Sequence, residues 1–383
     1  MRHLYLAATG QNRGKTTAAL GLVDGFQRRG LHTGFMKPVG QRTVIEDGVP
    51  ADEDAVLMRS AFHLPEPLAD MSPVHIPRGF TKAYIAGEVV EDLGARIRAA
   101  HRRFADHDVL VVEGTGHAGV GAVIGLSNAV VAAMLGAPAV IVSEGGVGRP
   151  IDEIVLNASH FAAHGVPVAG AIVNKVRMDE QPGIEDTLRR GLALHGIPLL
   201  GVLPYRPILS NPTLGMILEG VRGTLIEAGP DLDRVIGNVA IAAMEPQHVM
   251  QHVRPDTLVI CPGDREDVIL TLTTARLVGR PRLVTAAELI GGSLPDAPAA
   301  PGIGLVLTGG YAPRDAVLTA IRQAGMFAAI VDKDTYTVAS EIHDLLVKTH
   351  AGDAGKIEMI KALVWDYLKI DRVLDAATEA RFA

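Results

Sequence analysis

The segment LAATGQNRGKTTAAL at residues 6–20 constrains the fold more than any other part of the sequence. A short apolar run leads into a loop with two glycines, and a run with helical periodicity follows the loop directly. The backbone N–H groups of such a loop, together with the N-terminus of the helix, form a cradle for phosphate. A lysine followed by a threonine adds a cation for the phosphate and a hydroxyl for Mg²⁺. A turn that merely caps a helix needs neither, so we predict a nucleotide site here.

The loop departs from the usual phosphate-loop pattern at one position. The pattern G-x-x-x-x-G-K-S/T places a glycine five residues before Gly14, and Thr9 stands there instead. Gly10, one position later, can together with Gly14 still supply the tight turn and the close approach of backbone to phosphate. The expected nucleotide-binding residues of the loop are Thr9, Gly10, Asn12, Gly14, Lys15, Thr16 and Thr17.

Short aliphatic runs alternate with helical patterns over the first half of the chain. This alternation is typical of a parallel sheet that is covered by helices on both faces. We therefore predict an α/β fold with a P-loop NTPase-type parallel sheet, followed by a smaller α/β domain. The expected strands of the first sheet are His3–Ala8, Thr33–Lys37, Val109–Glu113, Ala139–Ser143, Ala169–Asn174 and Pro198–Leu203.

Polar residues at the carboxyl ends of these strands are the site candidates, because ligands of open α/β sheets bind there. Glu113 follows four apolar residues and is placed to hold Mg²⁺ directly or through water, or else to cap the next turn. Asp52, Glu53 and Asp54 precede a helical pattern, where they supply either a second metal carboxylate or N-terminal capping. Lys37 ends a strand and is either a site lysine or one that lies along apolar surface.

Composition narrows the class of protein. A chain of 383 residues with 48% apolar residues is long enough for two globular domains. The single cysteine, Cys261, excludes a disulfide framework, and the start of the chain shows no signal-peptide pattern, so we expect a cytoplasmic protein. A net charge of −7 without a basic block argues against a nucleic-acid partner, and no apolar run is long enough to cross a membrane.

A second segment begins near Ser210 and has strand-like runs of its own, VAIAAM, TLVICPG, GLVLTGG and AAIVDK. The stretch GGSLPDAPAAPG at 291–302 reads as a surface loop within this segment. The tail from Asp353 to Ala380 has apolar residues at helical spacing and predicts one amphipathic helix packed on the second domain.

The motifs GKTT, KPVGQ, DEDAVLM, VVEGTG, VNKV and LGVLP, in this order, resemble the dethiobiotin synthetase branch of P-loop proteins. They are still more similar to the synthetase-like N-terminal region of long bacterial phosphotransacetylases. The resemblance implies that Thr16, Asp54 and Glu113 hold Mg²⁺. It implies that Lys37 contacts a carboxylated substrate or the γ-phosphate, and that Asn174 faces the base, although Asn174 is also a suitable turn residue at a strand end.

The base and the acceptor are read from two further stretches. Guanine readers of the N-K-x-D type need an aspartate where NKVR has Arg177, so we expect ATP rather than GTP. Where dethiobiotin synthetases read their diamine, this chain has EGTGHAGVGAVIGLSN. His117 there is either an acid–base group or a hydrogen-bonded loop residue, and Arg149 is a candidate clamp for phosphate or carboxylate. His160 and His164 lack an acidic third metal ligand.

The second segment resembles the DRTGG domain that follows the synthetase-like region in phosphotransacetylases. Its signature is split here between GDRED at 263–267 and LTGG at 307–310. We expect a P-loop domain over 1–209 and a DRTGG-like regulatory or ligand-binding domain over 210–383, without the acetyltransferase domain of those enzymes. The signature residues Asp264, Arg265, Thr308, Gly309 and Gly310 also suit turns at strand ends.

Two functions are compatible with these residues. The first is an Mg·ATP-dependent enzyme, with Lys15 and Lys37 as catalytic residues, that transfers phosphate to or ligates a small carboxylate-bearing substrate. The alternative is a nucleotide-sensing regulatory protein with little or no turnover. In both cases we expect a small-molecule substrate or effector, no nucleic acid, no membrane, and assembly into a homo-oligomer.

Overall fold

A computed structural model describes residues 1–229, 231–278, 302, 304–345 and 347–380. The chain divides into two compact units, one formed by Met1–Arg206 with Thr349–Ala383 and the other by Pro207–Lys348. The chain therefore leaves the first unit and later returns to it. Most of the predicted surface loop at 291–302 lies outside the described residues.

The first unit is built on a six-stranded parallel sheet in the order β10-β9-β8-β1-β7-β2. Its strands are β1 (Arg2–Ala8), β2 (Thr33–Met36), β7 (Val109–Glu113), β8 (Ala139–Glu144), β9 (Val168–Val176) and β10 (Leu199–Pro204). Their residues are almost all buried, as in a parallel sheet covered on both faces. The predicted fold class is confirmed, and the central position of β1 brings the loop after it between the ends of β7 and β8.

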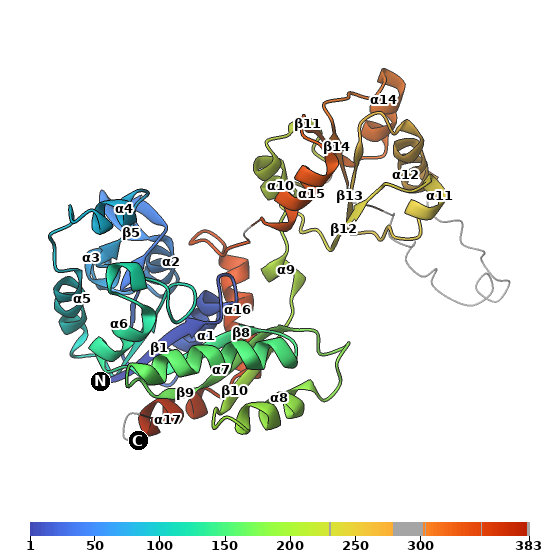
Figure 1. Cartoon of the computed structure of the whole chain (residues 1–383). Helices are drawn as coiled ribbons and strands as arrows, with labels where there is room; N and C mark the ends of the chain where they lie inside the picture. The colour runs from blue at the N-terminus through green and yellow to red at the C-terminus, as the bar shows by residue number, and fades with distance from the viewer. Residues whose placement is uncertain (230, 279–301, 303, 346, 381–383) are drawn as a thin grey trace. The chain divides into compact units, whose positions relative to one another are not determined.

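Helices cover both faces of this sheet (Figure 1). The crossovers through α6 (Asn128–Leu135), α7 (Gly148–Ala163) and α8 (Ile184–Ala193) all lead toward β10 and lie on one face. The crossover through α1 (Lys15–Arg28) leads the opposite way and, because such connections are right-handed, lies on the other face. Within the described residues, no helix is long and apolar enough to span a membrane.

Between β2 and β7 the chain forms a smaller insertion that carries one side of the site. It contains β3 (Val39–Gly40) paired with β6 (Val74–His75), and a hairpin of β4 (Thr43–Glu46) and β5 (Val49–Asp52). The helical segments are α2 (Glu53–Phe62), α3 (Leu68–Met71), α4 (Phe80–Ile85), α5 (Leu93–His101) and η1 (Arg102–Phe104), and η2 (Ala122–Ile124) follows β7. Asp52 caps α2 by accepting a hydrogen bond from the N–H of Asp54 at 3.1 Å.

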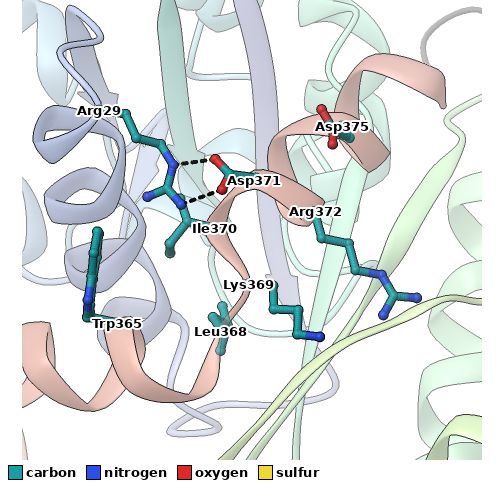
Figure 2. Close-up of a pocket in the computed structure, with 8 residues that line it drawn as sticks. All are labelled: Arg29, Trp365, Leu368, Lys369, Ile370, Asp371, Arg372 and Asp375. Atoms are coloured by element: carbon teal, nitrogen blue, oxygen red, sulfur yellow. Dashed lines mark hydrogen bonds and ion pairs between the residues drawn. The ribbon is translucent and has the colours of Figure 1, made fainter.

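The tail of the chain differs from the prediction of one helix on the second domain. It forms two helices, α16 (Ala354–Tyr367) and α17 (Ile370–Glu379), and both pack on α1 of the first unit. Leu368 breaks the helix because it takes an extended conformation and bridges to Gly201 of β10. Around this break, Arg29 forms an ion pair with Asp371 at the rim of a pocket of about 530 Å³ (Figure 2).

The second unit is a five-stranded sheet in the order β11-β15-β14-β13-β12. Its strands are β11 (Thr224–Glu227), β12 (Asn238–Ile241), β13 (Thr257–Pro262), β14 (Gly304–Thr308) and β15 (Phe327–Ile330). Only β11 is antiparallel to its neighbour. The described helices are α9 (Pro207–Ser210), α10 (Leu214–Val221), α11 (Pro246–Val249), α12 (Glu266–Val278), α14 (Asp315–Gln323) and α15 (Thr335–His343). Two apolar clusters give this unit a core of its own.

Candidate functional site

Of the two glycines in the loop after β1, only Gly14 is required by the backbone conformation. Asn12 and Gly14 have positive φ values, 57° and 97°, and α1 begins directly after Gly14. A Cβ on Gly14 would lie 1.9 Å from Nδ2 of Asn174, so this position needs glycine twice over. Gly10 has no positive φ, and a Cβ there would meet only the Arg13 side chain at 3.4 Å. Thr9 can replace the missing glycine because its φ is not positive, and its hydroxyl lies 3.1 Å from Ser143 Oγ on the neighbouring strand β8.

Residues at the end of β9 hold the loop in place. Asn174 donates from Nδ2 to the carbonyl of Arg13 at 3.2 Å, and Lys175 donates from Nζ to the carbonyl of Asn12 at 2.9 Å. Glu144, at the end of β8, forms ion pairs with both Arg13 and Lys175. Asn174 therefore touches the phosphate loop itself, and its expected contact with a base stays a prediction. The sequence predicts that the turns Ser143–Arg149 and Asn174–Arg177 meet at the site, but it gives Glu144 and Lys175 no role of their own.

The predicted metal residues come together beside the first turn of α1. The hydroxyl of Thr16 lies 3.1 Å from Oε1 of Glu113 and 3.3 Å from Oδ1 of Asp54. Asp54 comes from the start of α2 and Glu113 from the end of β7, so three separate elements meet here. Lys37, just beyond β2, donates to Oδ2 of Asp54 at 2.6 Å and to Oε1 of Glu113 at 2.9 Å.

Burial gives this cluster unusual electrostatics. Glu113 and Lys37 are 1% and 4% exposed. Burial and the charge of Asp54, opposed by the attraction of Lys37, together raise the pKa of Glu113 to about 7. Burial alone would lower the pKa of Lys37, but the charges of Asp54 and Glu113 outweigh it and hold that pKa far above its ordinary value. The cluster therefore holds a permanent cation that does not fully neutralise its carboxylates, and burial also raises the pKa of nearby Asp52.

The donor set fits a magnesium ion. Mg²⁺ prefers carboxylate and hydroxyl oxygens next to the phosphates of a nucleotide. The cluster offers such oxygens from Thr16, Asp54 and Glu113, and Oε2 of Glu113 is buried without a hydrogen-bond partner. A buried carboxylate oxygen without a partner is costly, so a second cation at this position would stabilise the site.

The loop that follows β7 is held by two buried asparagines that the sequence reading missed. Oδ1 of Asn128 accepts from the Thr115 N–H at 3.0 Å and from the Tyr5 hydroxyl at 2.9 Å, and its Nδ2 donates to the carbonyls of Thr115 and His117. Asn157 accepts from the Ala118 N–H at 2.8 Å. Asn128 begins an otherwise apolar helix, and Asn157 lies on the apolar stripe of α7 between Ile154 and Phe161, which is the one signal in the sequence that marks them. They fix the backbone next to Glu113.

The remaining predicted site residues make contacts of their own outside the cluster of Thr16, Asp54 and Glu113. Lys15 is 9% exposed, and its Nζ lies 3.5 Å from the carbonyl of Gly10 within the loop, while Thr17 is half-buried in the first turn of α1. His117 is exposed and accepts from the Gly119 N–H at 3.2 Å, as a hydrogen-bonded loop histidine does. Arg149 is exposed and pairs with Glu153 on its own helix at 2.6 Å.

In the second unit, the two halves of the split signature meet because β13 and β14 are neighbouring parallel strands. The N–H of Gly263 donates to the carbonyl of Thr308 at 3.0 Å. Gly309 and Gly310 both have positive φ, 82° and 71°, so this turn needs its glycines. Arg265 forms an ion pair with Asp267 at 2.9 Å. The signature therefore shapes two adjoining turns at the carboxyl-terminal ends of β13 and β14.

Two families match the chain, one for each part. Residues 2–213 match the family described as AAA domain, and residues 216–345 match the family described as DRTGG domain. Phosphate acetyltransferase of Pseudomonas putida is 28% identical over 96% of this chain and 51% of its own length. That of Nitrosomonas europaea is 24% identical with the same coverage. The chain thus spans about half the length of these curated relatives.

Solved structures with similar parts share little sequence with this chain. The cell division ATPase MinD of Pyrococcus furiosus matches 55% of this chain and 86% of its own, at 12% identity and a TM-score of 0.32. The CBS and DRTGG domains of Clostridium perfringens pyrophosphatase match 42% of this chain and 63% of their own, at 17% identity and a TM-score of 0.28.

Proposed function

The chain belongs to the family described as AAA domain, and we propose that its first unit binds Mg·ATP as a regulatory module with slow turnover. One observation carries this proposal: Thr16, Asp54 and Glu113 converge beside the phosphate loop, with one buried carboxylate oxygen left without a partner. Such a cluster is costly in the absence of a second cation. Its place at the first turn of α1 is where the phosphates of a nucleotide meet the metal in P-loop proteins.

In this proposal each part of the loop has a defined task. The N–H groups between Thr9 and Thr16 surround the β-phosphate, and Lys15 neutralises the β- and γ-phosphates. Thr16, Asp54 and Glu113 hold Mg²⁺, which when bound offsets the charge of the phosphate oxygens. Asn174 and Lys175 keep the loop in shape through their bonds to its carbonyls. The absence of an aspartate at Arg177 favours adenine over guanine.

The side chains that would bind an acceptor substrate are already paired with other groups of the protein, and this favours regulation over catalysis. Lys37 is held between two carboxylates at 2.6 and 2.9 Å, Arg149 is paired with Glu153, and His117 accepts a bond within its own loop. We propose that the DRTGG unit takes a small-molecule effector or joins copies of the chain.

The second candidate is ATP-dependent phosphoryl transfer to a small carboxylate, and the position of Lys37 favours it. This ammonium sits among the groups that would hold the metal, next to the expected γ-phosphate. Lys37 becomes available to a substrate oxygen only when another cation satisfies Asp54 and Glu113. A carboxylate acceptor would then find a buried, permanently charged lysine.

Two measurements on the full chain separate the candidates. ADP release is measured with Mg·ATP alone and with a panel of small carboxylic acids; the regulatory proposal expects slow release that no acid accelerates. Hydrogen exchange is then compared with and without Mg·ATP at the turns 263–267 and 308–310, with the Lys15→Ala variant as the control. We expect ATP to change the exchange at these turns in the wild type and not in Lys15→Ala. Acid-dependent ADP release, or bound ATP without any change in the second unit, would overturn the regulatory proposal.

A further inference from the structure

A group of side chains that could hold a metal ion lies at the amino-terminal ends of β2 and β7 in the first sheet. His32 precedes β2 and His107 lies two residues before β7, and these two parallel strands are neighbours. Glu66 joins them from the segment between α2 and α3. One ligand atom from each of the three side chains lies within 4.8 Å of the others. The phosphate loop is at the carboxyl-terminal end of the sheet, and β2 alone separates the two ends by about 13 Å.

Both imidazole rings use their Nδ1 atoms for hydrogen bonds to backbone carbonyls. Nδ1 of His107 lies 3.2 Å from the carbonyl of Phe104, and Nδ1 of His32 lies 3.3 Å from the carbonyl of Asp106. A carbonyl can only accept, so Nδ1 carries the proton and a neutral ring keeps its lone pair on Nε2. Such bonds to carbonyls fix the tautomer of histidines that bind metals.

The contact between Glu66 and His107 needs a proton or a metal ion. Nε2 of His107 lies 2.9 Å from Oε1 of Glu66, so two atoms with lone pairs face each other in a buried place. Glu66 is 8% exposed and His107 is 6% exposed. Oε2 of Glu66 is buried and has no hydrogen-bond partner. A buried acceptor pair of this kind needs a proton or a metal ion between its members, and an unsatisfied buried oxygen is a reason to look for an ion.

We propose that His32, Glu66 and His107 form a binding site for a divalent transition metal of the zinc class. Two imidazole nitrogens and one carboxylate oxygen are ligands that Zn²⁺ accepts in tetrahedral sites, where neighbouring ligand atoms are about 3.3 Å apart. The pair of His107 and Glu66 is already close to this spacing. The ligand atom of His32 lies within 4.8 Å of those of Glu66 and His107, and the exposed side of its ring leaves the fourth position to water.

The backbone around the site is held firmly, as a metal site requires. The N–H of His32 donates to Oδ2 of Asp108 at 2.9 Å, and the N–H of Asp108 donates to the carbonyl of His32 at 2.8 Å. The two rings stack with centroids 3.8 Å apart. The metal would therefore tie the starts of two strands to the insertion that carries Asp54, and so stabilise the first unit.

The test uses the full chain without an affinity tag, stripped of metal with a chelator. Co²⁺ is titrated in the presence of excess Mg²⁺, which occupies the oxygen ligands near the phosphate loop. We expect one equivalent of Co²⁺ to give the visible bands of tetrahedral coordination, and Zn²⁺ to displace it. His32→Ala and Glu66→Gln should each weaken Zn²⁺ binding by roughly tenfold or more. His195→Ala, a change of another exposed histidine, should leave it unchanged.

Three results would overturn the site. They are no tetrahedral Co²⁺ spectrum from the wild-type chain, Zn²⁺ affinity in His32→Ala equal to that of the wild type, or loss of binding in a His160→Ala/His164→Ala variant instead. Since His32 is exposed, its variant should fold normally, which circular dichroism checks. The Mg·ATP affinity of His32→Ala should equal that of the wild type, so this site and the proposed nucleotide site can fail separately.

Discussion

The ammonium of Lys37 lies 2.9 Å from Oε1 of Glu113, and both side chains are buried. The same ammonium also serves Asp54, so one cation is shared by two carboxylates. Burial together with this incomplete neutralisation places the pKa of Glu113 at about 7. The metal-free chain thus contains a buried carboxyl group that changes its charge near neutral pH.

The stability of the metal-free chain should therefore depend on pH through Glu113. Its pKa rises from 4.5 in the unfolded chain to about 7 in the fold, so the folded state holds the proton more tightly. The stabilisation is fully present below about pH 4.5 and is lost as pH rises through about 7. The free energy of unfolding is measured with urea in EDTA. Between about pH 5 and about pH 8 it should fall by roughly 2–3 kcal/mol more in the wild type than in Glu113→Gln. An equal difference at both pH values would contradict this prediction.

The two glycines of the phosphate loop should respond differently to alanine. Gly14→Ala forces a side chain into a left-handed conformation and against Asn174, so it should lower the free energy of unfolding by more than about 1 kcal/mol. Gly10→Ala meets only a flexible arginine at 3.4 Å and should change it by less than about 1 kcal/mol. Thermal unfolding of both variants checks this contrast, and equal losses would show that the loop backbone is different.

Much of the candidate nucleotide site can be predicted from the sequence, because the phosphate loop has a local strand–loop–helix pattern and the resemblance to dethiobiotin synthetases selects Asp54 among the neighbouring acids. Thr16, Asp54 and Glu113 each stand at a junction between a strand or turn and the next element, and parallel strands bring such junctions to one edge. The supporting contacts are not local. Asn128 acts on the backbone at Thr115, 13 residues away, and Asn157 on Ala118, 39 residues away, and no sequence pattern specifies such pairs.

The return of the tail to α1 can be tested with a matched pair of glycines. Gly21 lies in α1, and a Cβ there would be 2.1 Å from Cβ of Val364 in α16. Gly21→Ala should destabilise the chain by about 1–3 kcal/mol through overpacking. Gly355 lies in α16 with nothing within 4 Å of a Cβ, so Gly355→Ala should be neutral or stabilising by up to about 1 kcal/mol. Equal melting temperatures for the two variants would contradict the packing of α16 on α1.

The prediction of one tail helix on the second domain is wrong for a physical reason. Helical spacing of apolar residues says that a helix buries one face, but it does not say against which partner. Here the partner includes Gly21 and Gly25, whose missing side chains let Val364 and Ile370 come close to α1. Strand β11 was also missed, because its Thr224–Glu227 segment is short and partly exposed.

Calorimetric titration of ATP into the full chain tests the central claim most directly. Wild type and the Lys82→Ala control, a change of an exposed lysine, should bind ATP in the presence of Mg²⁺ with equal affinity. Lys15→Ala should bind roughly 10- to 100-fold more weakly, because it loses a charge-assisted phosphate contact of about 1.5–3 kcal/mol. Wild-type binding should also weaken in EDTA, when Thr16, Asp54 and Glu113 have no metal to hold. Equal ATP affinity for wild type and Lys15→Ala, or an affinity that does not respond to Mg²⁺, would contradict the assignment of this loop as an Mg·ATP site.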